Sequence, residues 1–206
     1  MENVSENHNA PGHEVNPWTS IWIKPRATVR SAISNKPMKF AIILASIAGV
    51  TQLLDRAMDK DLGDSMSTMA ILLLAILAGP ILGLIGWWIW SGVAYIVGKW
   101  VGGIGSFEEM KMAVGLSSIP IVVSIGLYLL DLLFLGDALF MDVEVSMFQF
   151  LWLLFSVICS AVLSVWSIVI LIKGIAEVHL FSSWKAVLTL MIPFVILLII
   201  VLLLLI

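Results

Sequence analysis

The sequence is short of charge and has only one cysteine, and each shortage excludes a class of protein. Charged side chains make up 12% of the 206 residues, about half the share of an average soluble domain, whereas 61% are hydrophobic. A soluble core cannot use that much apolar surface, so a water-soluble domain is excluded. The single cysteine, Cys159, cannot form a disulfide or a cysteine-based metal cluster within one chain.

The sequence also lacks the motifs that mark common catalytic and cofactor sites. It contains no Walker A loop, no dinucleotide-binding glycine fingerprint, no Gly-x-Ser-x-Gly elbow and no His-Glu-x-x-His. Glu177 and His179 are two residues apart, and two lone groups do not make a metal site. We therefore predict no catalytic residues, no metal site and no cofactor, no nucleic-acid partner, and a protein that is not an enzyme.

What the sequence has instead is five long stretches with almost no charge. A helix that crosses a bilayer needs about 20 mostly apolar residues. The stretches are Phe40–Leu54, Met69–Val97, Ala113–Leu135, Met147–Ile172 and Ala186–Ile206. The first is short, but flanking basic side chains can snorkel toward water and lengthen it. The predicted fold class is all-α, a polytopic transmembrane five-helix bundle.

Basic residues are distributed unevenly among the segments that join these stretches. With the N-terminus in the cytoplasm, all but Arg56 and Lys60 of the 11 basic residues fall on the cytoplasmic side. Cytoplasmic loops of membrane proteins carry such an excess of Lys and Arg. We therefore predict a multi-pass protein of the cell (cytoplasmic) membrane, with a cytoplasmic N-terminus and an outside C-terminus.

The chain is predicted to have three parts. Residues 1–16 are polar and lack the apolar core of a signal peptide, so we expect a disordered tail. Residues 17–36 are basic and contain tryptophans, and they are predicted to form an amphipathic segment at the membrane interface. An ordinary positively charged flank is the alternative for this segment. Residues 37–206 form the five-span transmembrane domain.

Two cytoplasmic loops have related sequences. In the first, Ser106 and Glu109 have the spacing of a capping box, which predicts a helix start. After each loop come a lysine, then Ala-Val, and then Ile-Pro, ending at Pro120 and Pro193, although Met112 separates the lysine from Ala-Val in the first case. The two helical hairpins are therefore either a parallel duplication or a chance likeness of few positions.

Small residues recur every four positions in two of the spans, at the spacing that lets helix backbones approach closely. They are Ala75, Gly79 and Gly83 in the second span and Ser156, Ser160 and Ser164 in the fourth. We interpret both runs as helix-packing faces rather than as the lining of a pathway.

Asp131 is the only ionisable residue inside the predicted spans. An intramembrane carboxylate indicates proton or cation coupling. However, Asp131 lies five residues before Gly136, close to the predicted outer surface, where a carboxylate can stay hydrated. No second acid, histidine or arginine lies at a matching depth in the other predicted spans, so coupling is the weaker hypothesis.

Three phrases of the sequence match a known family in the expected order. They are Asn16–Thr28 before the first span, Gly103–Phe107 leading to Ile119-Pro120, and Trp166 through Gly174 and His179 to Lys185-Ala186. With these phrases the chain resembles the Yip family, the Ypt/Rab-interacting-protein domain of five-span membrane proteins, and in particular its bacterial branch. The resemblance runs from about Asn16 to the C-terminus and implies a five-helix arrangement with a cytoplasmic N-terminus.

The resemblance also bears on partners. Eukaryotic members are implicated in vesicle traffic and bind small GTPases through a cytosolic Asp-Leu-Tyr-Gly-Pro type motif, which this sequence lacks. Binding of a small GTPase is therefore not expected. For bacterial members the resemblance implies a cytoplasmic-membrane protein, in some cases accessory to ABC-type export and envelope defence.

The leading hypothesis is a non-enzymatic membrane adaptor that binds another membrane protein or a second copy of itself. An ABC-type export system is one candidate for the other membrane protein. The predicted partner and lipid contacts are Trp18, Trp22, Arg26, Arg30, Gly103, Gly105, Phe107 and Pro120. The alternative is a small transporter or channel that uses Asp131 and helices broken at Pro80, Pro120 and Pro193.

Overall fold

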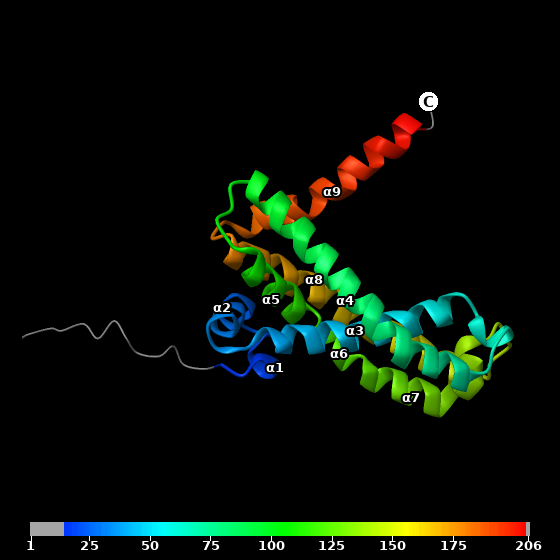
Figure 1. Ribbon diagram of the computed structural model, residues 1–206. Coiled ribbons are helices and arrows are strands. Elements are labelled where there is room, and N and C mark those ends of the chain that lie inside the picture. The colour runs from blue at the N-terminus through cyan, green and yellow to red at the C-terminus, as the bar shows by residue number, and fades with distance from the viewer. Residues whose placement is uncertain (1–14, 205–206) are drawn as a thin grey trace, which may run out of the picture.

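The computed structural model describes residues 15–204, and every regular element in that range is helical (Figure 1). Five helical stretches are long and apolar enough to cross a membrane, which confirms the predicted all-α, five-span class. The disordered tail predicted for residues 1–16 lies, apart from its last two residues, outside the described range. The predicted sidedness of the membrane stays a prediction.

Four of the five spans are continuous helices, and each extends beyond its predicted limits at one or both ends. They are α3 (Met38–Asp59), α4 (Thr68–Trp100), α8 (Met147–Val178) and α9 (Ser183–Leu204). Two short helices precede them, α1 (Pro17–Ser20) and α2 (Pro25–Asn35). The 3₁₀ turn η1 (Leu62–Asp64) lies between the first two spans, and the 3₁₀ turn η2 (Gly136–Phe140) forms the end of the third.

The third span consists of three helices, α5 (Phe107–Ser117), α6 (Ile119–Val123) and α7 (Ile125–Leu135). It starts at the predicted capping box, in which Ser106 and Glu109 bond each other's backbone N–H groups. The break between α5 and α6 coincides with Pro120, which has no N–H to continue the helical bonding. Pro80 and Pro193, by contrast, lie inside continuous helices, so the predicted breaks at these two prolines are wrong.

The closest helix pair is α3 with α4, and it is built on glycine. A Cβ added to Gly49 would lie 2.1 Å from the carbonyl oxygen of Gly79 and 2.6 Å from the Cα of Gly83. The predicted packing face of α4 is thus used within the chain. The serine run of α8 is only partly such a face, because Ser156 is buried whereas Ser164 is exposed.

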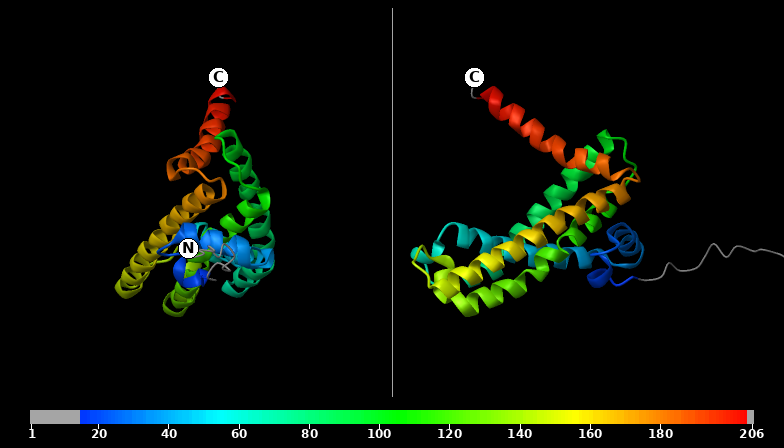
Figure 2. Two further views of the ribbon diagram at one scale, coloured as in Figure 1. Left: turned by 90° about the vertical axis from the view of Figure 1, so that its left-hand side faces the viewer. Right: turned by 180° about the vertical axis from the view of Figure 1, so that it is seen from behind.

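The molecule has two distinct ends, and α9 leaves the rest of the bundle from one of them (Figures 1 and 2). We call one the loop end; it comprises α2, residues 101–106 between α4 and α5, and residues 179–182 between α8 and α9. The far end comprises η1 and η2, which contact each other. From its start at the loop end, α9 diverges from α8, so its C-terminal half stands apart from the other helices.

Candidate functional site

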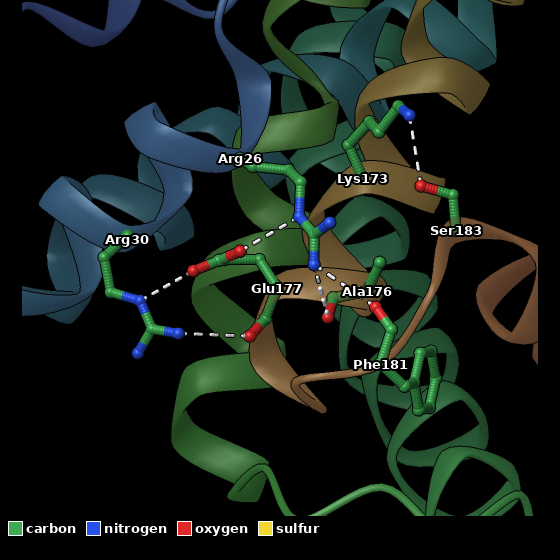
Figure 3. A network of polar contacts seen from close by, with 7 residues as sticks. All are labelled: Arg26, Arg30, Lys173, Ala176, Glu177, Phe181 and Ser183. Carbon is green, nitrogen blue, oxygen red and sulfur yellow. Dashed lines mark hydrogen bonds and ion pairs between the residues drawn. The ribbon is translucent and has the colours of Figure 1, made fainter.

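Two arginines of α2 bind one glutamate of α8 at the loop end (Figure 3). The Nε of Arg26 donates to one carboxylate oxygen of Glu177 at 3.0 Å, and the Nε of Arg30 donates to the other at 2.7 Å. Arg26 also donates through Nη2 to the carbonyls of Ala176 at 3.3 Å and Phe181 at 3.2 Å. These bonds attach α2 to the end of α8 and to the turn that follows it.

This arrangement changes the interpretation of the basic segment. Arg26 and Arg30 were predicted as partner or lipid contacts, and part of their charge is balanced inside the chain by Glu177. Nothing in the sequence pairs the arginines with this glutamate, since about 150 residues separate the groups. Glu177 belongs to the last turn of α8 and not to a loop, because the helix continues to Val178.

His179 lies directly beyond α8, buried between two glycines. A Cβ on Gly98 would lie 2.0 Å from its Nε2, and one on Gly103 would lie 2.3 Å from its Nδ1. Among the described residues neither ring nitrogen has a hydrogen-bond partner of good geometry. Burial lowers the pKa of this imidazole, against the opposing effects of the Ala94 carbonyl and Glu109, so the neutral ring is favoured.

The two loops of this end pack on each other through the other predicted contact residues. The N–H of Ile104 donates to the carbonyl of His179 at 3.4 Å, and a Cβ on Gly105 would lie 2.4 Å from Val178. Phe107 packs edge-on against Trp88, with ring centroids 6.0 Å apart. Gly103 and Gly105 are therefore required for close packing inside the chain.

The two tryptophans of the basic segment also make internal contacts. The indole Nε1 of Trp22 donates to the carbonyl of Trp18 at 2.8 Å. The ring of Trp18 packs edge-on against Phe40 of α3, with centroids 6.3 Å apart, and remains partly exposed. Between the tryptophans, Ile21 is fully buried. The segment is amphipathic, with one face on the bundle.

Two predicted residues lie away from the loop end. Pro120 is buried within α6. Asp131 of α7 is only 5% exposed, so the expectation that it stays hydrated is wrong. Its carboxylate accepts hydrogen bonds from the indole of Trp152 at 2.8 Å and from the hydroxyl of Ser156 at 2.7 Å.

A second acid lies close to Asp131, which the sequence argument missed. The hydroxyl of Tyr128, about one turn before Asp131, donates to the carboxylate of Asp55. Asp55 belongs to α3 because the first span continues to Asp59, well past its predicted end at Leu54. Within residues 15–204, no group of three or more His, Cys, Asp or Glu side chains is arranged to hold a metal ion.

Comparison with known proteins yields one match. The model of the Yip1 domain matches residues 19–205, which is most of the chain and includes all five spans of the structure. No curated protein and no solved structure gives a significant match.

Proposed function

The chain belongs to the Yip1-domain family and is a multi-pass membrane protein, and from that premise we propose that it is a non-enzymatic adaptor. In this proposal the loop end binds another membrane protein or a second copy of the chain. An ABC-type export system is one partner class to test, as the family resemblance implies. Binding of a small GTPase is not part of the proposal.

The proposal depends on two apolar side chains that the loop end exposes. Ile104 is 67% exposed and Leu180 is 57% exposed, in neighbouring loops joined by the bond between Ile104 and His179. Exposed apolar side chains that are grouped on a preformed surface mark contact sites.

Leu180 occupies a backbone position that is usually taken by glycine. Its φ of 53° is in the left-handed region, where the helix α8 ends. The N–H of Phe181 bonds the Ala176 carbonyl, as in a Schellman motif, whose left-handed position is usually glycine. The turn alone does not explain a leucine here, and a contact made by its side chain would.

Purification of the tagged full-length chain in a mild detergent tests the adaptor hypothesis. We expect a complex of defined subunit ratio that Ile104→Glu disrupts, because a charge cannot enter an apolar interface without cost. Val143→Glu is the matched control, since Val143 is also exposed and outside a helix but lies near the far end. Recovery of the single chain alone, or equal loss with both variants, would contradict the proposal.

A small transporter or channel is the second candidate, and the pairing of buried polar groups favours it. Asp131 and Asp55 come from different spans, and Tyr128, which bonds Asp55, lies about one turn from Asp131. The groups that donate hydrogen bonds to both acids are uncharged. Ion or proton flux in proteoliposomes that Asp131→Asn abolishes would support this candidate. Flux that is the same with and without the substitution would remove Asp131 from it.

A further inference from the structure

A large cavity opens between the glycine-packed helices and the base of α9. Its volume is about 790 Å³, and its walls come from α3, α4, α8 and α9, with the junction of α5 and α6 between them. Aromatic side chains of α4 and α9 meet beside it, where Trp90 and Phe194 have ring centroids 6.0 Å apart. The divergence of α9 from the bundle explains why these helices leave space here (Figure 2).

The cavity is elongated along α3. It is lined by residues of one α3 face, from Ala45 through Gly49 and Gln52 to Arg56. The eleven helical steps from Ala45 to Arg56 cover about 16 Å. A lining that extends this far along one helix suits a long acyl chain.

Most of the lining is apolar, and its charge lies at one end. Ser117 and Ser167 line it, but their hydroxyls donate to backbone carbonyls of the chain. Arg56 provides the only charge in the lining, beside Gln52, and among the described residues it has no ion pair. An arginine binds a phosphate group through two parallel hydrogen bonds.

We propose that this cavity binds one anionic phospholipid, with an acyl chain along α3 and the phosphate group at Arg56. The apolar walls match the chain, and the single cation at one end complements the headgroup. Basic pockets between membrane helices on the cytoplasmic side bind anionic lipid headgroups, and Arg56 offers the same charge complementarity on the predicted outer side. The inference is independent of the adaptor proposal, because the cavity lies within the spans and not at the loop end.

Native mass spectrometry of the purified full-length protein tests the proposal. The protein is incubated with phosphatidylglycerol or with phosphatidylcholine of the same acyl chains, and the retained lipid is measured. We expect one retained molecule, with phosphatidylglycerol preferred by about fivefold, since one basic residue contributes about that much to binding an anionic lipid. Equal retention of the two lipids would overturn the proposal.

Three variants separate the contribution of the charge at Arg56 from that of the apolar space in the cavity. Arg56→Gln should remove the preference for phosphatidylglycerol. Lys60→Gln should keep it, because Lys60 caps the C-terminus of α3 about one turn further on and lies outside the lining. Gly86→Leu should block retention of both lipids while the protein stays folded. Gly86 lines the cavity, and a Cβ placed there meets no atom within 4 Å.

Two further results would overturn the proposal. One is a preference for phosphatidylglycerol that survives Arg56→Gln. The other is a Gly86→Leu protein that still retains lipid but no longer self-associates, which would mean that a second copy of the chain occupies the cavity. The melting temperature of each variant, measured without added lipid, shows that the comparison is between folded proteins.

Discussion

The first and last spans are both 22 residues long, yet the rest of the molecule surrounds them to very different extents. In the most apolar window of α3, 39% of the residues are buried, against 6% for α9. α3 has the lowest mean hydropathy of the five spans and α9 has the highest. Burial within the protein therefore runs opposite to hydropathy.

The difference follows from what holds helices together in a bilayer. Lipid tails are as apolar as leucine, so large aliphatic side chains gain little by leaving lipid for a neighbouring helix. Small residues let backbones come close, and polar groups bond across. α3 has both, in Gly49 and in Asp55, whereas the second half of α9 consists of large aliphatic residues and one phenylalanine.

The largest effect is expected where α3 touches α4. Gly49→Ala should lower the free energy of unfolding by about 3 kcal/mol, because its Cβ would overlap the backbone of Gly79 and the helices would have to separate. Thermal or denaturant unfolding in detergent measures the loss. Gly92→Ala in α4 is the control, since its Cβ meets no atom within 4 Å. Equal stability of the two variants would show that α3 is not held by this contact.

A smaller loss is expected at the other end of α3. Tyr128→Phe removes the hydroxyl that donates to Asp55, and the carboxylate then lacks a partner, at a cost of about 1–2 kcal/mol. The same unfolding measurement applies. The chain has one other tyrosine, Tyr95, which makes ring contacts, and its hydroxyl donates no hydrogen bond among the described residues, so Tyr95→Phe should change little. A larger loss of stability for Tyr95→Phe than for Tyr128→Phe would show that the Tyr128–Asp55 hydrogen bond is not the more stabilising contact.

Acid is expected to loosen the base of α9 and not α3. Burial in the folded protein lowers the pKa of His179 below its value in the unfolded chain. Protonation of the imidazole therefore favours the unfolded chain, and stability is lost as the pH falls below about 6.5. Lys99 disfavours the protonated ring further, and Glu109 opposes this. Hydrogen exchange, corrected for its intrinsic pH dependence, should rise at residues 180–186 between pH 7 and pH 5.

The control for this pH effect is His179→Phe, which cannot titrate and keeps a ring between the two glycines. Its exchange at residues 180–186 should be nearly independent of pH over the same range. Residues 41–57 of α3 should show no acid-induced increase in either protein. Acid-induced exchange that persists in His179→Phe would exclude the histidine as its cause.

The smallest effect is expected on the outer half of α9. Leu197→Ala should change the free energy of unfolding by less than about 0.5 kcal/mol, because Leu197 is exposed to the surroundings. The same substitution in α3, Leu44→Ala, should cost about 2 kcal/mol or more, because Leu44 is buried. A large loss at Leu197 would mean that α9 is covered, as in a complex between copies of the chain.

Several features of the fold could be predicted because their causes are local. The capping box at Ser106 and the glycine spacing of α4 involve residues within a few turns of each other, and the structure confirms both. Span limits were less accurate. The charges of Asp55 and Arg56 ended the first predicted span, although the helix continues to Asp59. That error hid the contact between Asp55 and Tyr128.

The candidate site was predictable only in part. Gly103 and Gly105 lie at the same end of the molecule as the arginines of α2, since they face His179 and Val178, next to the glutamate that binds the arginines. Their internal partners are not predictable, because the predicted fourth span ends at Ile172, before Glu177, and no motif indicates a role for His179. The burial of His179 depends on the backbones of Gly98 and Gly103, which come from another hairpin.

The sequence by itself determined the class of the protein and its five spans. Run length, charge position and composition are properties of the chain in order, and a bilayer of nearly constant thickness converts them directly into crossings. Only the tertiary structure decided that Glu177 binds both arginines, that α9 stands apart and that a cavity with one cation lies beside α3. These features depend on which helix faces are neighbours, and small differences in side-chain shape along whole helices determine that choice.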